Sequence, residues 1–112
     1  MKLDSAVFYT NNLDRAIAFY RDIVGLKVDY IQRGRFASFK LESVKLGIKK
    51  AVEKREIPGH QTVFIEVDNI KEIYDQFKSK KVIFLKELVT EDWATNFSIL
   101  DPDGNKLQFI KK

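Results

Sequence analysis

The sequence contains no cysteine, one histidine, two prolines and one tryptophan among 112 residues. The lack of cysteine excludes disulfides, thiol nucleophiles and zinc-thiolate sites, so any metal ion would need histidine and carboxylate ligands. No apolar run reaches the roughly 20 residues that span a bilayer. Residues 1–14 also lack the apolar segment of a secretion signal. We therefore expect a cytoplasmic protein without a membrane partner.

Charge of one sign is not concentrated anywhere in the chain. Twenty Lys and Arg residues are mixed with sixteen Asp and Glu residues, which gives a formal net charge of +4. The basic residues form only short doublets, a pattern typical of a solvated surface rather than a nucleic-acid interface. Hydrophobic residues make up 45% and charged residues 32%. This balance is typical of a globular protein.

An internal repeat organises the chain. Residues 8–21 (FYTNNLDRAIAFYR) match residues 65–78 (IEVDNIKEIYDQFK) at an offset of 57, since 65 minus 8 is 57. Each segment predicts a strand end, an Asn cap and an amphipathic helix, with Asn12 and Asn69 as the capping residues. Glu72 completes a capping-box pattern with Asn69. Gly25 is suited to end the first helix.

Three strand-like runs follow each helix. The first three are residues 26–32, 35–41 and 45–50, and the second three are residues 83–89, 94–100 and 106–112. In the final turn, DPDG predicts that aspartate side chains accept hydrogen bonds from nearby amides and that Gly104 has a positive φ. We expect one α+β domain over residues 1–112, made of two βαβββ modules at residues 1–52 and 59–112 with a linker at 53–58. Each module is too small to bury a sufficient core alone, so the two must pack, within one chain or across a dimer.

With this repeat, the chain resembles the vicinal oxygen chelate superfamily of glyoxalases, bleomycin resistance proteins and extradiol dioxygenases. The resemblance is carried by the opening segment LDSAVFYTNNLDRAIAFYRDIVGLKV, by VFIEVDNI and by the closing hairpin EDWATNFSILDPDGNKLQFI. It implies a U-shaped mixed sheet around a pocket. In the family's metalloenzymes, the first and last strands of both modules supply the ligands of a divalent metal.

The four positions that correspond to these ligands are Ser5, Gly47, Thr62 and Gln108. The repeat supports this placement, because 5 plus 57 is 62 and 47 plus 61 is 108. None of the four residues has the imidazole or ionised carboxylate that zinc or nickel prefers. The resemblance therefore points to the metal-free, bleomycin-resistance-like members, and we expect no metal and no cofactor.

One alternative is a divergent glyoxalase-type or dioxygenase-type enzyme with a different ligand set. If strand pairing extends to His60, this residue shares a face with Thr62 and Glu66, and His60, Glu66 and Gln108 could form a site. Otherwise the sequence has no nucleophile with a neighbouring base and no phosphate-binding loop. We assign no catalytic residue.

We expect a pocket that is apolar with a few polar groups. Strand alternation predicts that Phe8, Val63, Ile65 and Val67 face the helices, and that Lys45 lies beside Gly47 on the pocket side. Trp93 would offer a flat face for stacking. The predicted ligand-binding residues are Ser5, Val7, Tyr9, Gly47, Lys49, Thr62, Phe64, Glu66, Trp93 and Gln108.

The resulting hypothesis is a protein that binds, and in that way sequesters, a small, partly aromatic molecule. Because the protein is net positive and has lysines near the pocket, a neutral or anionic ligand is favoured over a polycation. The resemblance also implies a homodimer. A third hypothesis is a ligand-free structural or regulatory partner, whose pocket would be filled by its own side chains.

Overall fold

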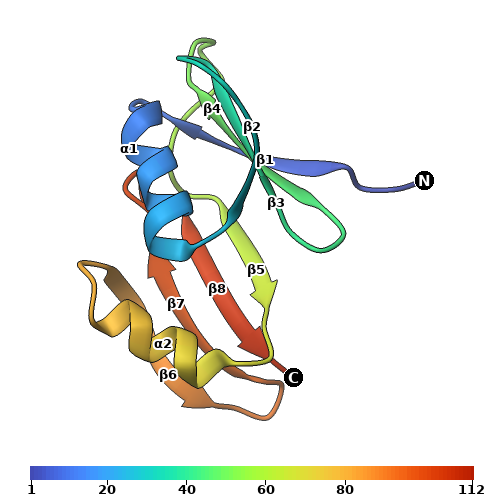
Figure 1. Ribbon diagram of the computed structural model, residues 1–112. Coiled ribbons are helices and arrows are strands. Elements are labelled where there is room, and N and C mark those ends of the chain that lie inside the picture. The colour runs from blue at the N-terminus through green and yellow to red at the C-terminus, as the bar shows by residue number, and fades with distance from the viewer. The chain divides into compact units, whose positions relative to one another are not determined.

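The computed structural model describes residues 1–112, which divide into two units, Met1–Gly59 and His60–Lys112 (Figure 1). The first unit contains β1 (Ser5–Thr10), α1 (Leu13–Ala18), η1 (Phe19–Val24), β2 (Lys27–Gln32), β3 (Phe36–Lys40) and β4 (Lys45–Lys50). The second contains β5 (Thr62–Glu66), α2 (Ile70–Lys78), β6 (Ile83–Thr90), β7 (Thr95–Leu100) and β8 (Lys106–Lys111). The predicted order of elements, βαβββ twice, is confirmed.

Each unit has one four-stranded mixed sheet. The strand orders are β1-β4-β3-β2 and β5-β8-β7-β6. In each sheet the first strand pairs in parallel with the last strand of its unit, and the other neighbours are antiparallel. The predicted α+β class is therefore correct. No helix in the structure has the length and apolarity needed to cross a membrane.

The first helical segment begins as the sequence predicts. The Asn12 side chain accepts a hydrogen bond from the Arg15 amide at 3.1 Å, as expected of a residue that caps the first turn. The helix then widens from α1 into η1, a stretch of π-helix that the 3.6-residue pattern does not predict. Gly25 ends it with a φ of 85°, a conformation that glycine adopts without a steric penalty.

The second helix differs from the prediction at its cap. Asn69 is the residue before α2, but its side chain accepts no hydrogen bond from the helix amides. Its Nδ2 instead donates to Glu72 Oε2 at 3.3 Å. The predicted capping box is therefore wrong at this helix, because the two side chains bind each other rather than the backbone.

Aromatic side chains form the core between α2 and its sheet. The rings of Phe97 and Phe109 stack with their centroids 5.1 Å apart, and Phe77 of α2 packs edge-on against both. Among the predicted core residues, Phe8 and Ile65 are buried, whereas Val63 and Val67 are half-buried. Each sheet therefore has one face against its own helix.

The turn between β7 and β8 forms as predicted. Asp101 Oδ1 accepts hydrogen bonds from the amides of Asp103 and Asn105 at 2.9 and 2.8 Å. Gly104 has a φ of 91°. This turn sets the pairing of β7 with β8, and so places Ser98 opposite Gln108.

Candidate functional site

The face of each sheet that points away from its own helix is called here the distal face. Its residues alternate along the strands with those that pack against the helix. In the first unit it comprises Ser5, Val7, Tyr9, Lys45, Gly47, Lys49, Phe36, Ser38 and Lys40. In the second it comprises Thr62, Phe64, Glu66, Lys106, Gln108, Ile110, Asn96, Ser98 and Leu100. All predicted ligand-binding residues except Trp93 lie on these two faces. Trp93 lies in the loop between β6 and β7.

The four positions where the family's metalloenzymes have ligands occupy equivalent places in the two units. Gly47 lies opposite Val7, and Gln108 lies opposite Phe64, as the repeat requires. The Phe36 ring covers Gly47 so closely that a Cβ on the glycine would lie 2.5 Å from Phe36 Cζ. The distal face of the first unit thus has a phenyl ring where a metal ligand would project.

These residues do not fit a divalent metal of zinc or nickel character. Ser5 and Thr62 offer neutral hydroxyl groups, Gly47 offers no side chain, and Gln108 offers one amide oxygen. Within each unit, no three His, Asp or Glu side chains gather in a way that could hold an ion.

His60 does not join this arrangement. β5 begins at Thr62, and His60 has a φ of 64°, so the strand alternation does not extend to it. The alternative metal site of His60, Glu66 and Gln108 required His60 to continue the alternation of β5, and it does not. The His60 side chain is exposed, and its amide donates to the Gly104 carbonyl at 3.4 Å.

A chain of hydrogen bonds crosses the distal face of the second unit. Gln108 Nε2 donates to Asn96 Oδ1 at 2.7 Å, and Asn96 Nδ2 donates to Glu91 Oε1 at 2.8 Å. Lys86 forms an ion pair with the same carboxylate. Hydrogen bonds from Lys86, then Asn96 and also Trp93, hold the pKa of Glu91 below its ordinary value. The side chains of β6, β7 and β8 are thus joined to the loop that carries Trp93.

Ser98 lies next to this chain but is not part of it. The residue is 0% exposed, and its hydroxyl has no hydrogen-bond partner. Most buried polar groups in proteins are paired. The second unit therefore contains an unsatisfied hydroxyl beside Gln108.

In the first unit, Lys49 is bound to the segment that follows β4. Its Nζ lies 2.7 and 2.8 Å from the two carboxylate oxygens of Glu56. Glu56 also accepts hydrogen bonds from the amides of Val52 and Glu53, and its side chain is buried. The hydrogen bond from Lys49, followed by those two amides, lowers the pKa of Glu56 from 4.5 to about 2. The positive charge of Lys49 is therefore balanced by the Glu56 carboxylate.

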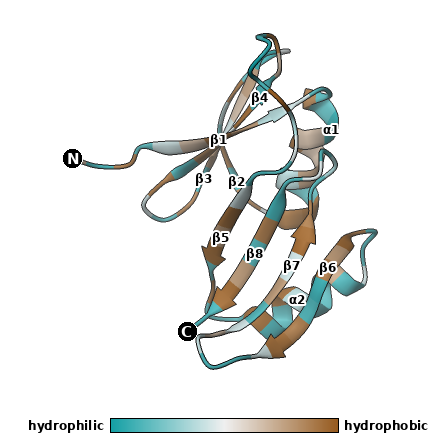
Figure 2. Ribbon diagram, turned by 180° about the vertical axis from the view of Figure 1, so that it is seen from behind, coloured by the Kyte–Doolittle hydropathy of each residue, from teal (hydrophilic) through white to brown (hydrophobic).

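Large apolar side chains remain accessible around both distal faces. Tyr30 of β2 is 53% exposed, and its ring lies 5.9 Å from that of Phe36. In the second unit, Phe64 is 62% exposed and Trp93 is 49% exposed. Figure 2 shows the strands of this second sheet from the side opposite α2, with hydrophobic stretches along them. These surfaces suit an aromatic ligand better than an ion.

Four residues that shape these faces were missed at the sequence level. Phe36, Asn96 and Ser98 lie on middle strands, and their alternation with buried neighbours places them on the distal faces. Applying the two-residue period to β3 and β7 would have found them. Glu56 has no such signal, because it lies in a charged segment that resembles a solvated linker.

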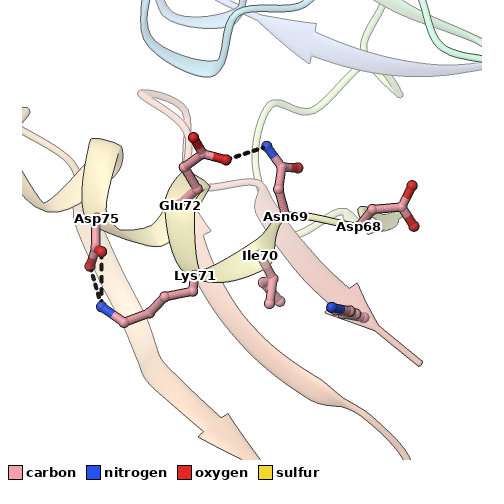
Figure 3. Close-up of a pocket in the computed structure, with 7 residues that line it drawn as sticks. Asp68, Asn69, Ile70, Lys71, Glu72 and Asp75 are labelled. Carbon is pink, nitrogen blue, oxygen red and sulfur yellow. Dashed lines mark hydrogen bonds and ion pairs between the residues drawn. The ribbon is translucent and has the colours of Figure 1, made fainter.

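A separate pocket lies at the start of α2 (Figure 3). Four of its polar side chains bind one another in pairs: Lys71 Nζ lies 2.7 Å from Asp75, and Asn69 donates to Glu72. The lining residues are Asp68, Asn69, Ile70, Lys71, Glu72, Asp75 and Lys111. None of them belongs to the predicted site, and we assign no function to this pocket.

Comparison with known proteins agrees with the fold described above. The family model described as Glyoxalase/Bleomycin resistance protein/Dioxygenase superfamily matches residues 2–109. A comparison with curated proteins finds no match.

Several solved structures are similar over nearly the whole chain. TnmS3, an antibiotic binding protein from Streptomyces sp. CB03234, is 17% identical with a TM-score of 0.89, over 99% of this chain and 95% of that one. TioX from Micromonospora sp. ML1 is 15% identical with a TM-score of 0.85, over 99% and 98%. Lactoylglutathione lyase from Agrobacterium tumefaciens is 22% identical with a TM-score of 0.81, over 97% and 92%. At these identities the likeness shows a shared fold.

Proposed function

The chain belongs to the Glyoxalase/Bleomycin resistance protein/Dioxygenase superfamily, and from this we propose that it binds a small, partly aromatic molecule without a metal ion. The ligand is neutral or anionic, and binding sequesters it as a drug or metabolite. The observation that carries the proposal is the composition of the two distal faces, which combine accessible aromatic rings with residues that cannot form a metal centre.

The chemistry at the ligand positions supports binding over metal catalysis. Gln108 has about the size of a ligating glutamate but no charge. Its amide nitrogen already donates a hydrogen bond to Asn96 Oδ1. Phe36 covers Gly47, so the first unit presents a hydrocarbon surface at the equivalent position. The neutral amide of Gln108 and the Phe36 ring over Gly47 both favour an uncharged organic ligand over a cation.

The accessible aromatic side chains supply the contact area. Phe64 can pack against a flat ring, Trp93 offers another accessible ring in the loop between β6 and β7, and Tyr30 extends the apolar surface of Phe36 in the first unit. TnmS3, which has the same fold, is described as an antibiotic binding protein. This precedent supports a binding role on the same fold.

The net charge selects among possible ligands. With a formal charge of +4, the protein repels polycations at long range and attracts anions. Lys106 adds positive charge to the distal face of the second unit. We therefore expect neutral or anionic aromatic molecules to bind in preference to a cationic drug of the bleomycin kind.

Fluorescence of Trp93, the single tryptophan, tests the proposal directly. Neutral and anionic aromatic molecules should change this fluorescence in a saturable manner. The variant F64A should weaken binding about three- to tenfold, and L3A, which alters an exposed leucine outside the strands, should not. Saturable binding of the cationic drug alone would overturn the proposal.

The metal content of the purified protein, before and after addition of zinc, nickel, manganese and iron(II), is the second test. We expect no tight stoichiometric metal, because the four ligand positions supply no imidazole or carboxylate. Tight metal binding at a ratio of one per chain would instead favour a metalloenzyme, and glyoxalase and dioxygenase assays would follow.

We also propose that the protein is a homodimer. Support comes from the family resemblance and from the small size of each unit, which limits the apolar surface that it can bury alone. Sedimentation velocity should show a species of twice the 13.1 kDa chain mass. A monomer at micromolar concentration would contradict this part of the proposal.

A further inference from the structure

One row of side chains crosses the distal face of the second unit at its centre. The strand register places Phe64, Gln108, Ser98 and Lys86 side by side on β5, β8, β7 and β6. Gln108 is 4% exposed and Ser98 is 0% exposed, whereas Phe64 at the edge of the row is 62% exposed. An accessible aromatic ring therefore lies beside the buried Gln108, and the buried Ser98 lies one strand further along the row.

The amide of Gln108 has a fixed orientation. An ionised carboxylate such as Glu91 only accepts hydrogen bonds, so the donor nitrogen of Asn96 must face it. Asn96 Oδ1 then faces Gln108 and must receive a donor, which is Gln108 Nε2 at 2.7 Å. This order leaves Gln108 Oε1 pointing away from Asn96 as an acceptor. Glu91 thus determines, through Asn96, which end of the Gln108 amide a ligand meets.

Ser98 supplies the second polar group. Its hydroxyl can donate one hydrogen bond and accept others, but it has no partner in the protein. The residue lies directly opposite Gln108 in the β7–β8 pairing. The neighbouring cation, Lys86, is already paired with Glu91 and offers little free charge. The centre of the face is therefore polar, uncharged and incompletely satisfied.

We propose that Gln108 Oε1 and Ser98 Oγ anchor a neutral ligand group that both donates and accepts hydrogen bonds, such as a carboxamide or a hydroxyl on an aromatic ring. The donor of the ligand binds Gln108, its acceptor binds Ser98, and its ring packs against Phe64. This inference rests on the proposed binding function and narrows it from neutral or anionic ligands to neutral ones. A carboxylate has no hydrogen to donate. Its oxygen and the Gln108 oxygen are both acceptors and would repel each other.

Three matched probes test the anchor: 2-naphthamide, 2-naphthoate and naphthalene, titrated into the full chain by calorimetry. We expect 2-naphthamide to bind about tenfold more tightly than either of the other two, since it alone is neutral and can form both hydrogen bonds. In S98A the affinity for 2-naphthamide should fall about three- to tenfold. In Q108L the preference for the amide over naphthalene should disappear.

A serine outside the distal faces offers a matched control. Ser43 is exposed in the loop between β3 and β4. S43A should leave the affinity for 2-naphthamide unchanged. S98A removes one oxygen and changes the packing little. It therefore still tests the role of Ser98 if Q108L fails to fold. Amide ¹⁵N–¹H spectra of each variant report whether the fold is retained.

The outcomes separate this inference from the proposed function. Equal binding of all three probes, tighter binding of 2-naphthoate, or unchanged binding of 2-naphthamide in S98A would overturn the anchor while small-molecule binding stands. Binding of none of the probes to the unaltered protein at millimolar concentration would overturn the anchor and count against the proposed function as well.

Discussion

Ser98 carries a hydroxyl that is fully buried and has no hydrogen-bond partner. Such a group costs about 1–3 kcal/mol relative to a hydroxyl that is satisfied. A folded protein can retain this cost where the group serves a ligand, because sites for binding are often not optimised for stability. Function and stability should therefore oppose each other at this residue.

We predict that S98A raises the free energy of unfolding by about 1 kcal/mol, because it removes the unsatisfied hydroxyl and keeps nearly the same volume. Urea denaturation followed by circular dichroism measures this change. S38A serves as the control and should not be stabilising to the same degree. A loss of stability in S98A would show that the hydroxyl has a partner in solution.

Glu56 presents the opposite case, a buried charge that is fully satisfied. Its carboxylate binds Lys49 and the amides of Val52 and Glu53, and its pKa falls from 4.5 to about 2. Because the folded state holds the proton less tightly than the unfolded state, Glu56 stabilises the protein fully above pH about 4.5. This contribution is lost as the pH falls towards about 2.

In E56Q, we predict a lower melting temperature at neutral pH and a smaller decrease of that temperature between pH 4.5 and 2. The amide keeps the size of the side chain but cannot pair with the Lys49 charge. Thermal melts at a series of pH values, with E53Q as the control, measure the difference. Parallel pH curves for E56Q and the unaltered protein would exclude this role for Glu56.

At the level of elements, the residue type at Gly47 of β4 depends on the Phe36 ring of the neighbouring strand β3. Gly47 lies beneath the Phe36 ring of β3, and a Cβ would approach the Phe36 Cζ to 2.5 Å and the Val7 Cγ2 to 3.3 Å. The ring can rotate away, but it would then leave its contact with Tyr30. A glycine in the middle of a strand is explained here by close packing.

We predict that G47A lowers the free energy of unfolding by about 1–2 kcal/mol, because the ring must move. In an F36A background the same substitution should cost less, since only the 3.3 Å contact with Val7 Cγ2 remains and alanine loses less backbone entropy than glycine. A double-mutant cycle by chemical denaturation measures this coupling. Additive effects would contradict the packing explanation.

The helix starts show how far local sequence determines an element. Asn12 caps α1 as its residue type predicts, whereas Asn69, in the equivalent position of the repeat, binds the Glu72 side chain. Both helices nevertheless begin within one residue of the prediction. Most of the stability of each helix comes from packing its apolar stripe on the sheet, and the cap adds a smaller contribution to that stability.

At the scale of the whole molecule, the two units have the same topology but different distal faces. The first has a phenyl ring over a glycine, and the second has the Gln108 amide beside the Ser98 hydroxyl. Equivalent strand positions of the two units therefore carry different side chains.

We predict that residues 60–112 alone unfold at a lower temperature than the whole chain, or show no cooperative transition. This fragment has 53 residues (112 minus 60 plus 1), and a domain of about that size buries only about 60% of its surface. Circular dichroism melts of the fragment and of the full chain compare the two. A fragment as stable as the full chain would show that each unit is independent.

The sequence by itself determined the fold. The repeat, the helix stripes, Gly25 and the DPDG turn are local patterns, and the bounds of the three strands after each helix were predicted within one residue. It also determined the residue types at the four family ligand positions, and so the absence of a metal-binding donor set there. These features depend on residues close in sequence or on chemical identity alone.

Only the tertiary structure decided how the side chains of the distal faces interact. The Phe36 ring over Gly47, the pair of Lys49 with Glu56 and the bond from Gln108 to Asn96 each join residues on different segments. Alternation can place such a residue on a face, but it cannot say which atom faces which partner. That choice depends on side-chain rotamers and strand register, which follow from packing across the whole unit.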